Sequence, residues 1–300
     1  MENKKYLISG ATGFLGKHIV ALLSKETFDT IGRGDLNTIK FDFTQNHSVL
    51  ELFNKYEYLI IASGHAHVMK EGRQDAYLHL AVNFKGVQAL ISAIDTSCLK
   101  GVVYISTVAV YGTQLDKPFT EDDELQGDTA YAKSKIAAEN YLTEWSLRSN
   151  IPILILRIPL IAGKNPPGNL GKMIRAIRNG RYFSILGGKA RRSVILAEDL
   201  SEFILNNCGK SGIYNLSDGL HPTYRELEVL ISKQLNVNYP KGLPLIIAKC
   251  LALLGDVFSF IPFNSQKLKK MSQDLIIDDT KARMELGWKP QGVIANFKIQ

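Results

Sequence analysis

Continuous apolar segments alternate with amphipathic, helix-patterned segments through the first half of the chain. The apolar segments are KYLIS, FDTIG, YEYLIIAS, GVVYIST and IPILILRIPL, with helix patterns such as LGKHIVALLSK and AYAKSKIAAENYLTEWSLRSN between them. A strand that is apolar on both faces must be covered on both faces, and a helix between successive strands makes those strands parallel. We therefore expect an α/β fold with a doubly wound parallel sheet.

The second half of the chain departs from this alternation. AGKNPPGNLG, at residues 162–171, is rich in Gly, Pro and Asn, which is typical of a loop. The following GKARRSVILAEDLSEFIL predicts a return to the sheet, GIYNLSD predicts a further strand, and the remainder is mainly helical. We expect a sheet domain formed by residues 1–161 and 191–218, and a smaller, mainly helical substrate-binding lobe formed by residues 162–190 and 219–300.

Three glycines at intervals of three follow the first apolar segment, in LISGATGFLG, between a predicted strand and a predicted helix. In such a GxxGxxG turn, the first glycine allows the tight turn, the second lets a pyrophosphate approach the backbone, and the third lets the helix pack on its strand. A tight connection that binds nothing is the alternative. The position at the first strand-to-helix junction favours an NAD(P) site in a Rossmann-type domain. Its expected residues are Gly10, Thr12, Gly13, Phe14, Leu15 and Gly16.

The end of the second predicted strand distinguishes between the two nicotinamide dinucleotides. NAD sites carry an Asp or Glu there for the ribose 2′-hydroxyl, whereas this chain has Gly32 followed by Arg33. A guanidinium suits a 2′-phosphate, so we expect NADP as the preferred cofactor. Asp35 keeps a 2′-hydroxyl contact, and therefore NAD, possible. Asp42 is a candidate to bind the adenine amino group or, equally, to cap the next helix.

Tyr131 and Lys135 lie four residues apart in TAYAKSKIAAE, on one face of a predicted helix. An ammonium near the phenol lowers the pKa of the tyrosine, and such a phenol exchanges a proton with a substrate hydroxyl or carbonyl. Lys133 offers a competing basic side chain. Thr107 or Ser106, at the end of the preceding strand, can supply a hydroxyl to the same oxygen. These groups predict acid–base chemistry beside a nicotinamide ring.

Together, these motifs resemble those of the extended short-chain dehydrogenases/reductases, in the NAD-dependent epimerase/dehydratase group that acts on nucleotide sugars. The resemblance runs from GATGFLG to DDTKARMELGWKP and covers nearly the whole chain. It implies a catalytic hydroxyl role for Thr107 and an acid–base role for Tyr131. For Lys135 it implies both tuning of that tyrosine and binding of the nicotinamide ribose. Asn83, in NFKG, would help to order the site or be packed within its helix.

The resemblance also implies substrate contacts in the second lobe. PGNLGKMI resembles the family's nucleotide-sugar segment, in which Asn169 would contact the diphosphate. RRSVILAEDL resembles the family's return strand, in which Arg192 would pair with a phosphate and Asp199 would be structural. Leu160 stands near where related epimerases often carry an Asn, so their sugar-ring contacts do not carry over directly.

Composition indicates which partners and which compartment to expect. The chain has 36 basic and 29 acidic residues, a net charge of +7, with scattered basic residues, which favours a small anionic ligand over nucleic acid. Three widely spaced cysteines indicate reduced thiols in a cytoplasmic protein. His65 and His67 have no further clustered ligands, so we expect no metal there. Their segment, ASGHAHVM, resembles the cofactor-lining strand end of bacterial amino-sugar 4-reductases and 4-epimerases.

One long apolar stretch raises the question of a membrane segment. LPLIIAKCLALLGDVFSFIPF, at residues 243–263, is interrupted by Lys249, Asp256 and prolines. These interruptions favour a buried helix over a membrane span. The first ten residues, MENKKYLISG, lead directly into a strand and hold no apolar signal segment.

Several functions stay open at this stage. The family's 4,6-dehydratases carry an Asp-Glu pair after the hydroxyl residue, where this chain has Val108 and Ala109, which argues against dehydration. We expect NADPH-dependent reduction of a 4-keto (6-deoxy) nucleotide sugar, with an NAD-dependent 4-epimerase as the alternative. A third hypothesis is a non-catalytic dinucleotide sensor, and the presence of both Tyr131 and Lys135 argues against it. The family often pairs its two long middle helices, which makes a homodimer possible.

Overall fold

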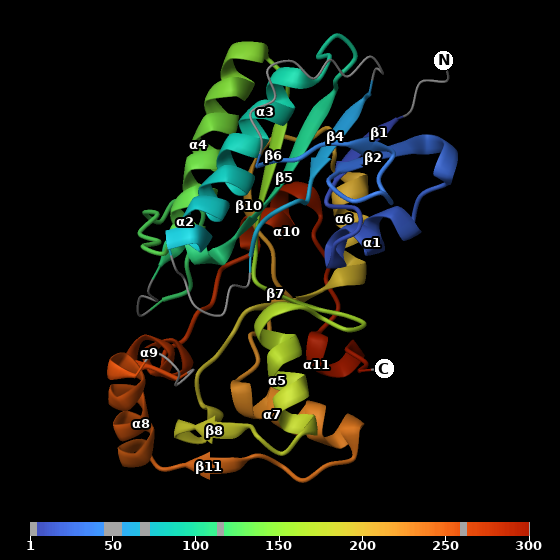
Figure 1. Cartoon of the computed structure of the whole chain (residues 1–300). Helices are drawn as coiled ribbons and strands as arrows, with labels where there is room; N and C mark the ends of the chain where they lie inside the picture. Colours follow the sequence, from blue (N-terminus) through green and yellow to red (C-terminus); the bar gives the residue numbers. More distant parts are fainter. Residues whose placement is uncertain (1–4, 45–55, 67–72, 113–116, 259–262, 300) are drawn as a thin grey trace.

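The main sheet of the protein contains seven parallel strands. The computed structural model describes residues 5–44, 56–66, 73–112, 117–258 and 263–299 (Figure 1). Within these residues the strand order is β10-β6-β5-β4-β1-β2-β3, and each neighbouring pair runs parallel. The strands are β1 (Tyr6–Ser9), β2 (Phe28–Gly32), β3 (Ile39–Lys40), β4 (Tyr58–Ile61), β5 (Gly101–Thr107), β6 (Ile153–Ile158) and β10 (Gly212–Asn215).

Helices cover both faces of this sheet, as Figure 1 shows. Successive β1 residues point to opposite faces: Leu7 packs in the core under α3 and α4, whereas Ile8 packs in the core under α1, α6 and α10. The expected doubly wound α/β fold is confirmed. These helices are α1 (Phe14–Ala21), α3 (Gly86–Ala93), α4 (Ala130–Ser149), α6 (Ala197–Asn206) and α10 (Thr280–Leu286); α2 (Arg73–Leu80) and a π-helical turn (Ala81–Lys85) lead into α3.

The cap residues explain where two of the longer helices begin. The Thr129 side chain accepts a hydrogen bond from the Ala132 amide at the start of α4, and Asn150 ends that helix in a left-handed conformation. In the second lobe, Thr223 and Glu226 form a reciprocal capping box at the start of α7 (Tyr224–Leu235). These boundaries follow from local side-chain chemistry.

A second, smaller core lies beyond the carboxyl ends of the main strands. It is formed by α5 (Gly168–Arg178), α7, α11 (Val293–Asn296) and the two-stranded pair of β7 (Leu160–Ala162) and β9 (Val194–Leu196). A second pair joins β8 (Phe183–Ile185) to β11 (Lys241–Leu243). Short 3-10 turns occur at Lys25–Thr27, Val108–Tyr111 and Leu186–Gly188, and α8 (Leu245–Val257) and α9 (Ser265–Ser272) complete the lobe.

Two sequence-based expectations are wrong in detail. The segment Val194–Leu196 does not return to the main sheet but pairs with β7, because β10 already occupies the free edge of β6. The apolar α8 is not a buried helix, since most of its large side chains are exposed. No helix in the described residues has the length and apolar character needed to cross a membrane.

The last helical segments return to the main sheet. Trp288 packs edge-on against Phe203 of α6, with ring centroids 5.0 Å apart, and its indole nitrogen donates to the Ser217 carbonyl. Ala282 of α10 belongs to the same core cluster. The division of the chain into a sheet domain (residues 1–161 and 191–218) and a second lobe (residues 162–190 and 219–300) stays a prediction. Residues 280–288, which this division places in the second lobe, pack against the main sheet.

Candidate active site

The glycine turn between β1 and α1 brings backbone very close to backbone. Gly10 has φ +76°, and a Cβ there would lie 2.5 Å from the Ser63 amide nitrogen. A Cβ on Gly16 would lie 2.1 Å from the Gly10 carbonyl oxygen. The first and third glycines are therefore required by the packing of the turn on the residues that follow β4 and on its own helix.

The middle of the turn fits the pyrophosphate of a dinucleotide. Gly13 caps α1, supplies no side-chain acceptor to the helix N-terminus, and is exposed; Gly13, Phe14 and Leu15 line a cavity. The first turn of α1 holds no acidic residue. Backbone N–H groups and the positive end of the helix dipole therefore face a space that an anion can enter.

The residues expected at the adenosine end lie beyond β2. Arg33 follows β2 directly and is exposed. Asp35, the acid that would favour NAD, forms an exposed ion pair with Lys40, with 2.6 Å between Nζ and Oδ1. Asp42 accepts hydrogen bonds from the amide and the hydroxyl of Thr44, at 2.9 and 2.7 Å. The local turn therefore uses one carboxylate oxygen of Asp42.

A cavity of about 580 Å³ lies between the carboxyl ends of the main strands and the second lobe. Its wall brings together residues from β5, α4, α5 and the segment before β9 that are far apart in the sequence: Thr107, Tyr131, Lys135, Asn169 and Arg192. Gly10, Thr12, Gly16, Arg33 and Asp42 lie outside this lining. In a parallel sheet, ligands bind at the carboxyl ends of the strands, so the cavity lies where chemistry is expected.

Thr107 and Tyr131 face each other in this wall. Burial raises the pKa of the Tyr131 phenol, and a side-chain hydrogen bond with Thr107 opposes that rise. The Thr107 hydroxyl also accepts from the Ala109 amide at 3.2 Å. Ser106, the alternative hydroxyl, instead donates to the buried Glu139 carboxylate. The geometry therefore favours Thr107 over Ser106 as the hydroxyl partner of the tyrosine.

Lys135 lies deeper in the wall than Tyr131. Its ammonium donates to the Ile105 carbonyl at 2.8 Å and lies 4.6 Å from the centre of the Tyr104 ring. Burial lowers the pKa of Lys135 to about 8, and the negative charge of Glu139 opposes this shift. Lys133, the competing basic residue, is exposed. The expectation that the charge of Lys135 lowers the pKa of Tyr131 stays a prediction.

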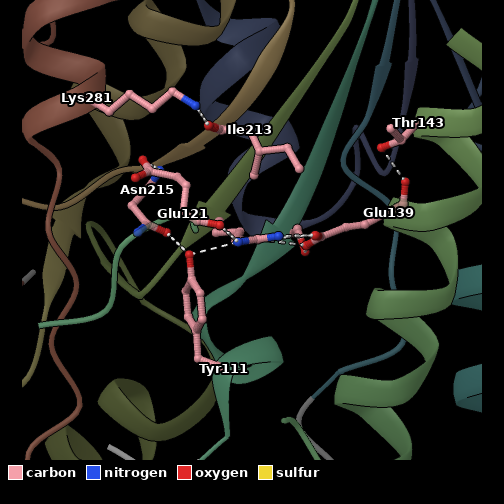
Figure 2. A network of polar contacts seen from close by, with 9 residues as sticks. Tyr111, Glu121, Glu139, Thr143, Ile213, Asn215 and Lys281 are labelled. Atoms are coloured by element: carbon pink, nitrogen blue, oxygen red, sulfur yellow. Dashed lines mark hydrogen bonds and ion pairs between the residues drawn. The ribbon is translucent and has the colours of Figure 1, made fainter. Parts of the chain in front are cut away.

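A buried polar network lies behind Lys135, and Figure 2 shows its members. Glu139 accepts two hydrogen bonds at one oxygen from Arg157, at 2.8 and 3.1 Å. The guanidinium also donates to the Tyr111 hydroxyl at 2.9 Å, and that hydroxyl donates to Asn215 at 2.8 Å. The network joins α4 to three segments of the sheet domain.

Asn83 holds the loop after β4 against α4. Its amide oxygen accepts from the His65 amide at 2.7 Å, and its amide nitrogen donates to the His65 carbonyl and to Ser134, each at 3.0 Å. His79 also bonds the His65 carbonyl, and its ring centroid lies 5.5 Å from that of Tyr131. Asn83 lies in the π-helical turn, a feature frequent at functional sites.

Residues close in sequence to β9 and α5 contribute further polar groups to the cavity wall. Arg192 is buried, donates to the Tyr224 hydroxyl at 3.1 Å and to the Gln273 carbonyl at 2.6 Å, and borders the cavity. Asn169 lies in the first turn of α5 and also lines the cavity. Asp199 accepts from the Gln291 amide at 2.6 Å, a structural contact.

The described residues hold no group of three or more His, Cys, Asp or Glu side chains arranged for a metal. His65 lies beside the cavity wall, with its ring 4.8 Å from that of His79. Burial lowers the pKa of His65, and the neighbouring His79 acts in the same direction. His67 lies outside the described residues.

Comparison with known proteins identifies the family. The model of the NAD-dependent epimerase/dehydratase family matches residues 6–216. The chain belongs to this family. The dTDP-D-glucose 4,6-dehydratase of Bos taurus is 28% identical in an alignment of 254 positions, which covers 75% of this chain and 71% of the relative.

Solved structures agree with this assignment at the level of the fold. UDP-glucose 4-epimerase from Thermus thermophilus, in complex with NAD, has a TM-score of 0.73 at 18% identity and covers 96% of this chain and 94% of its own. RMD from Pseudomonas aeruginosa, complexed with NADPH, has a TM-score of 0.71 at 21% identity and covers 97% of this chain and 95% of its own. Members of this fold thus hold either nicotinamide dinucleotide.

For this epimerase/dehydratase family member, the structure adds residues that the sequence reasoning missed. Glu139 lies one turn beyond Lys135 on the same face of α4, a spacing visible in the sequence. Arg157 is a charge inside an otherwise apolar strand, and such a charge needs a buried partner. His79 gives no comparable signal, because only the tertiary fold places it beside Tyr131.

Proposed function

We propose that this family member is an NADPH-dependent reductase of a nucleotide sugar that carries a 4-keto group. The observation that carries the proposal is the end of β2: no acid stands at the ribose position, Arg33 is exposed there, and Asp35 is paired with Lys40. A guanidinium binds two oxygens of a 2′-phosphate with full charge. A reductase exchanges its cofactor at every turnover and draws on the reduced pool, for which NADPH is suited.

In this proposal, Tyr131, Thr107 and Lys135 of the cavity wall have separate roles in the reaction. NADPH, when bound along the glycine turn, supplies the hydride to C4 of the sugar. Tyr131 donates a proton to the C4 oxygen, and the Thr107 hydroxyl holds that oxygen by a hydrogen bond. Lys135 binds the nicotinamide ribose and provides positive charge near the phenol. The contact between Thr107 and Tyr131 supports this arrangement, because both groups must reach one oxygen atom.

The same wall argues against a 4,6-dehydratase, although relatives of that name are 28% identical. Elimination of water needs groups that move protons at C5 and C6. Val108 and Ala109 line the cavity directly after Thr107, and their side chains have no group that can donate or accept a proton. A ketone already present in the substrate therefore fits this wall better than a ketone made by dehydration.

Two cationic side chains at the cavity wall support a nucleoside diphosphate sugar as the substrate. Arg192 and Lys172 border the cavity together with Asn169. A diphosphate offers several oxygens to such groups, and charge-assisted contacts of this type are the stronger ones. The sugar would then lie between this diphosphate site and Tyr131.

An NAD-dependent 4-epimerase is the second candidate. It is supported by likeness to proteins of that activity over nearly the whole chain, such as the UDP-glucose 4-epimerase of Mycolicibacterium smegmatis, 24% identical over 96% of this chain. An epimerase removes a hydride from C4 and returns it to the other face, so its cofactor ends unchanged. A dinucleotide sensor without catalysis has no observation in its favour, since Tyr131 and Lys135 both line the cavity.

One experiment separates these candidates. Freshly purified protein is denatured and its released cofactor assayed, and NADPH oxidation is then followed with a panel of UDP- and dTDP-4-keto-6-deoxy sugars. A reductase releases little NAD and oxidises NADPH with at least one sugar of the panel. Stoichiometric bound NAD, with a C4 epimer formed from UDP-glucose or UDP-GlcNAc without added dinucleotide, would overturn the reductase proposal. A cytoplasmic location and a homodimer stay predictions.

A further inference from the structure

The helix α8 packs with its small residues inward and its large apolar residues outward. Ala248 and Ala252 are buried, whereas the side chains of Ile246 and Leu253 are 77% and 63% exposed. Leu245, Ile247, Leu251 and Leu254 are exposed as well. A helix on the surface of a water-soluble domain normally has the reverse arrangement, with its large apolar residues facing the core.

All of these exposed apolar residues except Leu245, which lies beside the buried Ala252, form one continuous face. At 100° per residue, the residues from Leu253 and Ile246 round to Leu251 span an arc of roughly 160°. The two buried alanines lie on the opposite side, and Lys249 and Asp256 lie between the buried side and the apolar face. A helix with a broad apolar face that is bordered by charge along one edge resembles the helices that lie in the plane of a membrane interface.

Close packing fixes this orientation of α8. A Cβ at Gly255 would lie 1.7 Å from the Phe263 carbonyl oxygen, so the small side of the helix is in backbone contact with the following segment. Among the described helices and strands, α8 has its most extensive contact with α9. Turning the large residues inward would require α8 and the segment at residue 263 to separate.

The charged residues from β11 through α8 to α9 are mostly lysines. Residues 241–272 contain five lysines and one aspartate, a net charge of +4. Lys241, Lys249 and Lys269 are exposed. The acid, Asp256, accepts hydrogen bonds from the amide and the hydroxyl of Ser265 at 3.1 and 2.5 Å, so it serves the turn between α8 and α9.

We propose that α8, together with the lysines of residues 241–272, docks the protein onto an anionic lipid bilayer, with α8 lying flat in the interface. The exposed apolar side chains would enter the boundary between headgroups and acyl chains, and the lysines would contact anionic headgroups. A second copy of the chain fits this face less well, because a symmetric contact would bring two positively charged rims together. In Figure 1, α8 lies at the end of the second lobe, away from the main sheet.

The proposal is tested by sedimentation of the full chain with lipid vesicles. Wild-type protein is expected to sediment with vesicles of phosphatidylcholine and phosphatidylglycerol, and much less with phosphatidylcholine alone or at high salt, because screening weakens attraction to the headgroups. The variant Ile246→Ser/Leu253→Ser should bind the mixed vesicles at least about tenfold more weakly than the wild type, because two large apolar side chains no longer enter the lipid. Both replaced side chains are exposed, so thermal unfolding should change little.

A matched variant controls for the loss of apolar surface in general. Leu147→Ser/Met284→Ser removes two side chains that are 81% and 80% exposed elsewhere on the protein, and it should bind vesicles as the wild type does. Absence of wild-type binding to the mixed vesicles, or equal loss in both variants, would overturn the proposal. A wild-type dimer that Ile246→Ser/Leu253→Ser converts to a monomer, without vesicle binding, would assign the face to a second copy instead. None of these outcomes depends on the reaction proposed above.

Discussion

Glu139 and Arg157 form a buried ion pair behind the cavity wall, with 2.8 Å between the guanidinium nitrogen and the carboxylate oxygen (Figure 2). Their side chains are 2% and 3% exposed. Glu139 comes from α4, which carries Tyr131 and Lys135, and Arg157 comes from β6. The pair therefore fixes the helix that holds the proposed acid–base groups to the sheet.

Glu139→Gln should lower the free energy of unfolding by about 3–5 kcal/mol, because it leaves a buried guanidinium without its counter-charge. Urea unfolding followed by circular dichroism measures this loss. Glu144→Gln, at an exposed position of the same helix, should change stability by less than about 0.5 kcal/mol. Adding Arg157→Met to Glu139→Gln should recover part of the loss, since the unpaired charge is removed. A Glu139→Gln protein as stable as the Glu144→Gln control would contradict this account.

Lys135 should make stability rise with pH between about 8 and 10.5, the folded and unfolded pKa values of its ammonium. Within that window the unfolded chain keeps a proton that the folded chain has released, so raising the pH favours the folded state. Below pH 8 both states hold the proton, and the cost of burying the charge is present in full.

Unfolding of the wild type and of Lys135→Met at several pH values in this window measures the effect. The stability of the variant relative to the wild type should be greatest at the low-pH end and decrease as the pH rises. Lys133→Met, at an exposed position of the same helix, should follow the wild type at every pH. A constant difference between Lys135→Met and the wild type would mean that the pKa of Lys135 is not lowered.

Tyr131→Phe should abolish turnover and leave dinucleotide binding nearly intact. The phenol moves the proton, whereas the glycine turn and Lys135 are proposed to hold the cofactor. Steady-state kinetics and cofactor titration by fluorescence report the two effects separately. Tyr141→Phe, on the same helix, should retain wild-type turnover. Turnover above about a tenth of wild type in Tyr131→Phe would exclude the acid–base role, because such catalysis is worth 10²–10⁴-fold.

Arg33→Ala should weaken NADPH binding roughly ten- to a hundred-fold and leave NADH binding nearly unchanged. The lost interaction is a charge-assisted contact to the 2′-phosphate, worth about 1.5–3 kcal/mol. Calorimetric titration with both dinucleotides measures it. Arg148→Ala removes the same charge at an exposed position on α4 and should affect neither ligand. An equal loss of affinity for NADPH and NADH, or no loss, would show that Arg33 does not bind the 2′-phosphate.

Much of the fold was predictable because its signals are local. Alternating apolar and amphipathic segments predict the parallel strands and their helices, since side-chain periodicity follows directly from backbone geometry. The close approaches at Gly10 and Gly16 explain why no larger residue stands at either of these two positions. The spacing of Tyr131 and Lys135 places both on one helix face, and both line the cavity.

Contacts between distant segments were decided by the tertiary structure. The pairing of Glu139 with Arg157, the position of His79 beside Tyr131, and the pairing of β9 with β7 join residues whose separation in the sequence carries no periodic signal. The apolar segment at residues 243–263 is the clearest case. Its composition favoured a buried helix, yet close packing through Ala248, Ala252 and Gly255 turns its large side chains outward. The sequence by itself determines that α8 is apolar, but which side of a helix is buried depends on the backbone it packs against.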